Sequence, residues 1–296
     1  MADLALTSIM AVWGSSFAVL RGLMGDSAAS PLALVAVRMA MATGLLTGFL
    51  VLTPKGRAHL ASLRGTLLLD GLVCGGLLGI GFLLQTEGLQ RTTASRSGFL
   101  TGLLVVTVPL LEFALFRKRP PWPALLGVAL AFTGLSTLSA PWADASQATL
   151  LGDWLTVGCA IVFAGHIIAL GRLAPRHPVL PMLLLQLATV CALAAAFGPL
   201  VEAQHFATAQ ARLWLALLYL ALFATLLAFG IQTWAQKILP PVRVALISSL
   251  EPVFAALWAA LLIGERLSGR ELFGGALIIL GVAVGEAGAA WTRARV

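Results

Sequence analysis

The chain alternates between long apolar runs and short segments that carry charge, proline or glycine. Each run has close to the roughly 20 apolar residues that a helix needs to cross a bilayer. Charged and Gly/Pro-rich segments mark the ends of the runs. The pattern predicts ten membrane-spanning helices, at 4–23, 31–52, 67–89, 95–116, 122–140, 153–173, 179–200, 213–235, 243–263 and 271–291.

The second half of the chain repeats features of the first half. At a spacing of 147 residues, Phe82-Leu83-Leu84-Gln85-Thr86 reappears as Phe229-Gly230-Ile231-Gln232-Thr233. The same spacing relates Arg96 to Arg243, Gly127 to Gly274 and Gly134 to Gly281. At a spacing of 150 residues, Asp3-Leu4 reappears as Asp153-Trp154 and Pro31 as Pro181. The repeat covers both halves, so we expect two related structural units.

Five predicted helices precede the connection at 141–152 and five follow it. An odd number of helices per unit places the two units in opposite orientations in the membrane. We therefore expect an all-α polytopic membrane protein with ten transmembrane helices, in two inverted five-helix repeats around a central cavity. The repeats are residues 1–140 and 153–296, joined by an outer connection at 141–152. Related halves of this kind are typical of secondary transporters, which rock about a site between them.

Composition supports a membrane location. Hydrophobic residues make up 59% of the chain and charged residues 10%, with a mean hydropathy of +0.97, whereas soluble domains carry roughly 25% charged residues. The net charge of +7 is compatible with nucleic-acid binding by itself. The charges, however, stand singly or in threes between apolar runs, as topology determinants do. We expect no nucleic-acid partner and no soluble domain.

The distribution of basic residues predicts the orientation. With the N-terminus in the cytoplasm, the inner segments hold 12 Lys and Arg residues and the outer segments hold 6. The connection at 141–152 has neither Lys nor Arg, as an outer loop should. We therefore expect a multi-pass protein of the inner (plasma) membrane with both termini cytoplasmic.

Other classes of chemistry find little support in the sequence. The three cysteines form no C-x-x-C and lie in predicted helices, so we expect small buried hydrophobic residues rather than disulfides or zinc ligands. The glycine-rich run at 75–81 also lies within a helix, where close helix packing explains it better than nucleotide binding. No H-E-x-x-H or nucleophile elbow is present. We expect no enzyme, no metal and no cofactor.

Several short motifs follow one another in a specific order, although each motif alone is weak. The first predicted helix contains Trp13-Gly14-Ser15-Ser16-Phe17. The third and fourth contain Gln85-Thr86-Glu87-Gly88-Leu89-Gln90-Arg91-Thr92-Thr93-Ala94-Ser95, Gly98-Phe99-Leu100-Thr101-Gly102-Leu103 and Pro109-Leu110-Leu111. Gly264-Glu265-Arg266-Leu267, then Gly274 and Gly281, follow the ninth. Over nearly the whole chain, these motifs resemble those of EamA-type members of the drug/metabolite transporter superfamily.

The resemblance implies ten helices, two inverted repeats and a central cavity. It also implies movement of small metabolites, often amino acids or amphipathic compounds leaving the cell. One segment departs from the family pattern. Arg117-Lys118-Arg119-Pro120 stands where the family usually carries an acidic residue, and Lys118 is opposite Glu265 in the repeat.

Two groups of uncharged residues are candidates for the transport site. Gln85 and Thr86 fall near the outer end of their helix, and Gln232 and Thr233 near the inner end of theirs, which suits two gates or two interhelical hydrogen-bonded ties. The first and sixth helices offer residues near the midplane that could line the cavity or pack against lipid and core. They are Trp13, Ser16 and Phe17 in the first helix, and Phe163 and His166 at matching positions in the sixth.

Ionisable residues within membrane helices are costly and often functional. Arg38 could bind a carboxylate of a solute or pair with an acid of the protein. His166 and Glu251 are the deepest, and Glu251 precedes Pro252, which frees a backbone carbonyl. These two could share a proton, or could only satisfy the backbone or bind solute. Four other acids near helix ends are expected to be structural: Asp70, Glu87, Glu112 and Glu286.

Together these features predict a secondary transporter that exports amino acids, aromatic or large neutral ones first, or similar amphipathic compounds, by alternating access. A facilitative carrier or channel for another metabolite is the alternative, and a membrane-embedded enzyme is much less favoured. We expect a small-molecule substrate and membrane lipid as partners, a proton as the candidate coupling ion, and a monomer as the functional unit.

Overall fold

The computed structural model describes residues 1–25, 30–92, 94–140, 150–201, 211–264 and 266–293, and within these ranges it contains helices and no strands. Glu265 and most of the predicted 141–152 connection lie outside them. The first half forms α1 (Ala2–Gly25), α2 (Pro31–Leu52), α3 (Pro54–Ala61), α4 (Thr66–Leu89), α5 (Ala94–Gly102), α6 (Leu104–Phe116) and α7 (Trp122–Ser139).

The second half follows a similar order. It forms α8 (Leu150–Leu173), the 3₁₀ turn η2 (Ala174–Arg176), α9 (Val179–Val201), α10 (Ala211–Tyr219), the π-helical segment η3 (Leu220–Leu227), α11 (Ala228–Ala235), α12 (Pro241–Ser248), α13 (Glu251–Ile263) and α14 (Gly269–Arg293). Eight helical stretches in the described residues are long and apolar enough to cross a membrane. With 24 and 25 residues, α1 and α14 also exceed the length that a bilayer requires. The protein is therefore a multi-pass membrane protein.

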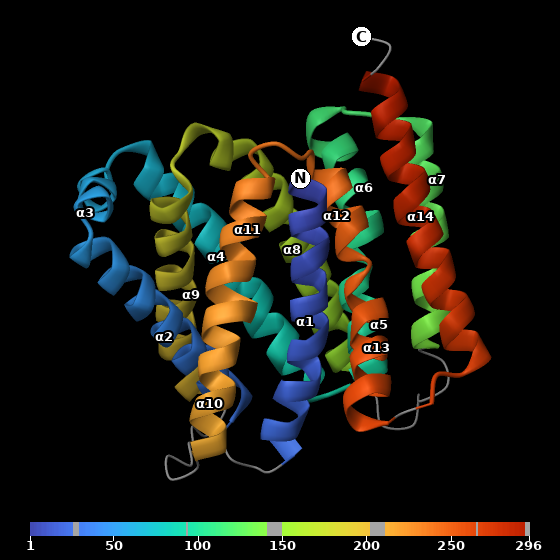
Figure 1. Cartoon of the computed structure of the whole chain (residues 1–296), viewed down its shortest axis with the longest axis horizontal. Helices are drawn as coiled ribbons and strands as arrows, with labels where there is room; N and C mark the ends of the chain where they lie inside the picture. Colours follow the sequence, from blue (N-terminus) through green and yellow to red (C-terminus); the bar gives the residue numbers. More distant parts are fainter. Residues whose placement is uncertain (26–29, 93, 141–149, 202–210, 265, 294–296) are drawn as a thin grey trace.

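The helices lie side by side, and their connections gather at two ends (Figure 1). The start of α1 and the end of α14 lie at one end, which we call the terminal end, together with α3 and the α6–α7 and α11–α12 connections. The opposite end, here the distal end, holds the α4–α5 and α13–α14 connections. Each membrane-spanning stretch therefore links the terminal end to the distal end.

Glycines set the closest helix contacts. A methyl group at Gly127 of α7 would lie 2.6 Å from the carbonyl oxygen of Gly281 of α14, and one at Gly134 would lie 2.6 Å from that of Gly274. Because the lower-numbered glycine of α7 faces the higher-numbered glycine of α14, these two helices run antiparallel. These four glycines therefore allow close packing of α7 against α14.

The glycine-rich run of α4 is also a packing surface. Gly71, Gly75 and Gly79 face α9, and a methyl group at Gly75 would lie 2.9 Å from the Cα of Gln186. The first helix of each half packs against the other half: α1 contacts α11, α12 and α13, and α8 contacts α4, α5 and α6. The two halves are thus interleaved across the whole bundle.

Two single helices expected from the sequence are broken in the structure. The predicted helix at 95–116 is split at Leu103 into α5 and α6, and the one at 243–263 is split at Ser249–Leu250 into α12 and α13. Pro252 lies in the first turn of α13, where its missing N–H costs little. The break therefore places Glu251 at the start of a new helix rather than inside a continuous one.

Candidate functional site

Four aromatic side chains form a continuous row between the two halves. Trp13 of α1 lies 5.3 Å from Phe229 of α11, measured between ring centroids. Phe229 lies 6.1 Å from Phe82 of α4, and Phe82 lies 5.7 Å from Phe163 of α8. We call these four side chains the ring row. Centroid separations of 4.5–7 Å are those of interacting aromatic pairs, so the rings form one connected surface.

The ring row is symmetric with respect to the sequence repeat: repeat-related rings occupy corresponding positions counted from its two ends. Trp13 and Phe163 are related by the spacing of 150 residues, and Phe82 and Phe229 by the spacing of 147. The row therefore begins and ends with one pair and has the other pair in its middle. Trp13 is further fixed because its Nε1 donates a hydrogen bond of 2.8 Å to the carbonyl oxygen of Ala224 in η3.

Arg38 brings a buried positive charge to the ring row. Its guanidinium carbon lies 5.2 Å from the centroid of the Phe82 ring, a cation–π distance. The residue is 6% exposed, and its Nε has no hydrogen-bond partner. Among the described residues, no carboxylate forms an ion pair with Arg38. A buried guanidinium in this position can donate hydrogen bonds to the carboxylate of a ligand.

A polar network lies one helical turn beyond the ring row, between α8, α9 and α11. His166 Nε2 donates to Gln186 Oε1 at 2.9 Å, and Gln186 Nε2 donates to Thr233 Oγ1 at 3.3 Å. Gln236 Nε2 donates to the carbonyl oxygen of Ile167 at 2.7 Å. The carboxamide oxygens of Gln232 and Gln236 are buried without a partner. The network thus retains acceptors that a water molecule or a polar solute could use.

The remaining predicted site residues lie apart from the ring row contacts. Ser16 donates its hydroxyl to the carbonyl oxygen of Trp13 within α1, at 2.7 Å. Glu251 is half-buried at the start of α13. Within the described part of the chain, Glu251 and His166 form no hydrogen bond or ion pair with each other. Thr86 is buried and Gln85 half-buried on α4. The side chain of Phe17 lies outside the described part of the structure.

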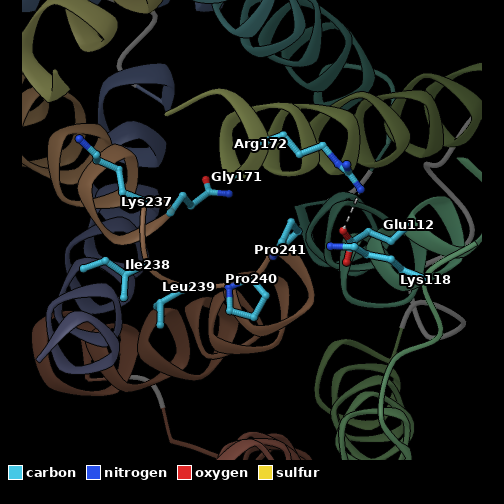
Figure 2. Close-up of a pocket in the computed structure, with 10 residues that line it drawn as sticks. Glu112, Lys118, Gly171, Arg172, Lys237, Ile238, Leu239, Pro240 and Pro241 are labelled. Atoms are coloured by element: carbon cyan, nitrogen blue, oxygen red, sulfur yellow. Dashed lines mark ion pairs between the residues drawn. The ribbon is translucent and has the colours of Figure 1, made fainter. Parts of the chain in front are cut away.

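A cavity of about 250 Å³ opens at the terminal end. Figure 2 shows Glu112, Lys118 and Arg172 grouped on one side of this terminal cavity, with Lys237 on the other side. An Arg172 Nη2 lies 3.9 Å from a Glu112 oxygen. Three basic side chains against one acid give the cavity a positive wall, which attracts anionic groups. Among the described residues, no three His, Cys, Asp or Glu side chains are grouped as metal ligands would be.

Four residues of the ring row and the polar network are not among the predicted site residues: Phe82, Gln186, Phe229 and Gln236. Phe82 and Phe229 belong to the repeated segment of the sequence, so the repeat could have identified them as candidates. Gln186 is a lone amide within the long apolar run of α9, and its polarity alone was the available signal. Which face of an apolar helix points inward cannot be inferred from hydropathy, because lipid and protein core accept the same side chains.

Comparison with known proteins gives concordant matches over the chain. The model of the EamA-like transporter family matches residues 1–140 and 150–284. An "Uncharacterized transporter" of Archaeoglobus fulgidus is 29% identical over 283 residues, 96% of this chain and 85% of that protein. A "Probable amino-acid metabolite efflux pump" of Escherichia coli is 28% identical over 309 residues, 97% of this chain and 95% of that protein. A solved crystal structure superposes with a TM-score of 0.80 at 19% identity, covering 96% of both chains, and shows the fold alone.

Proposed function

Because the chain belongs to the EamA-like transporter family, whose members are transporters and not enzymes, we propose that it exports small amphipathic metabolites across the inner (plasma) membrane by alternating access. Amino acids with aromatic or large neutral side chains are the first candidates. The name of the Escherichia coli relative, an amino-acid metabolite efflux pump by its printed description, supports the direction and the class of solute.

The proposed architecture is ten membrane helices in two inverted five-helix repeats, residues 1–140 and 153–296. It is supported by the antiparallel contact between the repeat-related helices α7 and α14. It is also supported by the ring row, which has one repeat-related pair of rings at its ends and the other pair in its middle. A site between two such repeats is the usual position for the solute of a secondary transporter.

The proposed orientation has the terminal end in the cytoplasm. Of the 12 basic residues of the predicted inner segments, 11 belong to the connections and helix ends of the terminal end, and Arg295 lies outside the described residues; the outer segments hold 6. The terminal cavity is then the cytoplasmic mouth of the pathway. Its basic wall would attract the carboxylate of a solute before the solute reaches the ring row.

The observation that carries the solute proposal is the Arg38 guanidinium against the ring row. A planar guanidinium binds a carboxylate through two parallel hydrogen bonds. The aromatic row offers an apolar surface to the side chain of the same molecule. An amino acid with a large apolar side chain provides both groups at once.

Counterflow in proteoliposomes, with a panel of labelled amino acids, tests this proposal. We expect transport of large apolar amino acids, and we expect Arg38→Gln to raise their half-saturation concentration roughly ten-fold or more, because a hydrogen bond to a charged group contributes about 1.5–3 kcal/mol. Arg38→Lys should recover only part of the affinity, since it cannot bind in a bidentate way. Arg64→Gln, at an exposed position, is the control. Equal transport by all three variants would contradict the assignment of Arg38.

A proton is the candidate coupling ion, and Glu251 and His166 are its candidate carriers. If Glu251 carries the proton, Glu251→Gln should abolish accumulation driven by a pH gradient and leave solute exchange intact, because the amide keeps the shape of the carboxyl group and cannot titrate. Unchanged pH profiles in Glu251→Gln and in His166→Gln would favour a facilitative carrier. A channel would differ from both carriers, since its flux would survive when the protein is locked in one conformation.

A further inference from the structure

Among the described residues, four ion pairs join the two halves. Arg172–Glu112 and His177–Asp70 lie at the terminal end, and the other two lie at opposite ends of the molecule. At the distal end, Arg96 of α5 pairs with Asp153 of α8. At the terminal end, Arg243 of α12 pairs with Asp3 of α1. The two arginines are related by the repeat spacing of 147 and the two aspartates by the spacing of 150. One contact is therefore the repeat counterpart of the other, and we call them the distal pair and the terminal pair.

The distal pair has the geometry of a strong contact. Arg96 Nε lies 2.9 Å from both oxygens of Asp153, and Arg96 Nη2 donates to Oδ2 at 2.7 Å. Thr92 donates to Oδ1 at 3.0 Å. Beside the pair, a methyl group at Gly152 would lie 2.7 Å from the carbonyl group of Arg91. The start of α8 is thus pressed against the end of α4 at the distal end.

The terminal pair is looser than the distal pair. Arg243 Nε lies 2.9 Å from Asp3 Oδ1, yet that oxygen accepts no hydrogen bond, so the contact has ion-pair distance without hydrogen-bond geometry. Arg243 instead donates to both oxygens of Glu286 on α14. The Asp3 side chain is 35% exposed, against 15% for Asp153. Here the arginine is shared between two acids.

The sequence explains this difference. Counting back 147 residues from Glu286 gives Ser139, so the first half has no acid at the equivalent position. The residues equivalent to Gly152 and Gly88 are Ala2 and Ala235, which carry methyl groups where the distal end has none. Separating charges in a weakly polar medium is costly unless each charge keeps a partner. Glu286 would keep a partner beside Arg243 if α1 moved away from α12.

We infer that the distal and terminal pairs are the closing contacts of the two ends of the transport pathway, and that Glu286 makes the terminal end the easier of the two to open. This inference rests on the proposed function and orientation. It deepens them, because an exporter that opens readily at its cytoplasmic end captures solute from the correct side. Asp3, Asp153 and Glu286 then act as positioning residues, which set the conformation without touching the solute.

Hydrogen exchange of the full-length protein in lipid nanodiscs, followed by mass spectrometry, tests the inference without any solute. Asp3→Asn should open the terminal end, so exchange should rise in peptides from 2–10 and 236–248 and fall in peptides from 94–102 and 150–158. Glu286→Gln should do the reverse, because Arg243 then binds Asp3 alone. Removal of the Asp3 charge and removal of the Glu286 charge should thus have opposite effects, although both acids lie beside Arg243.

Asp153→Asn should act like Glu286→Gln and shift the opening equilibrium roughly ten-fold, as expected for the loss of a charge-assisted contact. The matched control is Glu87→Gln, which breaks an ion pair with Arg91 four residues along the chain at the same end. It should change exchange locally and leave the terminal end unaffected. If Asp153→Asn does not fold, the charge exchange Arg96→Asp with Asp153→Arg should restore the fold and the exchange pattern of the natural protein.

Changes of the same sign in Asp3→Asn and Glu286→Gln would overturn the inference, as would changes confined to the mutated end. Failure of the proposed function is recognised separately. Opposite changes in hydrogen exchange at the two ends, together with no transport of any amino acid, would contradict the proposed solute and still support the closing contacts. Transport of amino acids without opposite changes in hydrogen exchange at the two ends would contradict the closing contacts alone.

Discussion

The rings of the ring row form one connected surface, so removing one ring should weaken solute binding. Trp13→Ala and Phe163→Ala each delete an end of the row, and loss of a buried aromatic contact is expected to cost about 1–3 kcal/mol of binding. Half-saturation concentrations for an apolar amino acid in proteoliposomes measure this loss. Phe49→Ala, at an exposed position on α2, is the control. Affinities like those of the natural protein in both variants would assign the rings to packing.

Arg117 holds a backbone conformation that suits glycine better. Its φ is +56°, and the repeat-equivalent residue, Gly264, has a φ of +74°. The left-handed region costs a residue with a side chain about 1–2 kcal/mol relative to its preferred conformations. We expect Arg117→Gly to raise the melting temperature in detergent, by an amount reduced by the greater freedom of glycine in the unfolded chain. Arg119→Gly, without this strain, should not; a lower melting temperature for Arg117→Gly would contradict the argument.

The repeat marked individual residues but not their neighbours. Equivalent residues near helix centres are expected to meet at the midplane, yet Trp13 and Phe163 lie at the two ends of one row, with Phe229 and Phe82 between them. Arg38 was notable as a charge within a helix. The contact between Arg38 and Phe82 was not predictable, because it depends on how α2 and α4 are rotated about their axes, and hydropathy carries no information on that rotation.

At the level of the helix, glycine decides which pairs can approach closely. A methyl group at Gly134 would meet the carbonyl oxygen of Gly274 at 2.6 Å and the nitrogen of Ile278 at 2.7 Å, whereas one at Gly76 would meet nothing within 4 Å. Gly134→Ala should therefore destabilise the α7–α14 contact by about 1–3 kcal/mol. Gly76→Ala should be neutral or stabilise by up to about 1 kcal/mol through helix propensity. Thermal unfolding in detergent compares the two, and equal melting temperatures would refute the packing argument.

The apolar runs predicted where helices lie better than where they break. The run at 31–52 coincides with α2, and that at 67–89 differs from α4 by one residue. The breaks between α5 and α6 and between α12 and α13 were missed, although Leu104 and Glu251, which begin α6 and α13, are equivalent in the repeat. Hydropathy averages over a run, and a break in the hydrogen-bond ladder leaves that average unchanged.

For the whole molecule, the orientation follows from charge and can be measured directly. The 12-to-6 distribution of basic residues predicts that both termini are cytoplasmic. A reporter active only outside the cytoplasm should be silent when fused at Val296 and active when inserted at 141–152. An exported C-terminus would contradict both the orientation and the inverted repeat.

The contacts between the halves required the folded structure. Arg96 and Arg243, and Asp3 and Asp153, were recognised as repeated residues, but nothing in the sequence pairs an arginine of one half with an aspartate of the other. Those pairings arise because α1 and α8 each pack into the opposite half. A repeat in the sequence is compatible with a first helix that packs within its own half or into the other half. Only the packing of the folded chain decides between these two arrangements.

The exchange of first helices also determines when the protein can assemble during synthesis. The helix that is made first, α1, packs against α11, α12 and α13, and Trp258 of α13 donates a hydrogen bond of 2.9 Å to the carbonyl oxygen of Ala11. These partners are synthesised only after residue 227. The nascent chain must therefore hold α1 in the bilayer without its neighbours for most of translation. A ribosome that stops before α11 would release α1 without any of these three partner helices, which would favour its recognition by membrane quality control.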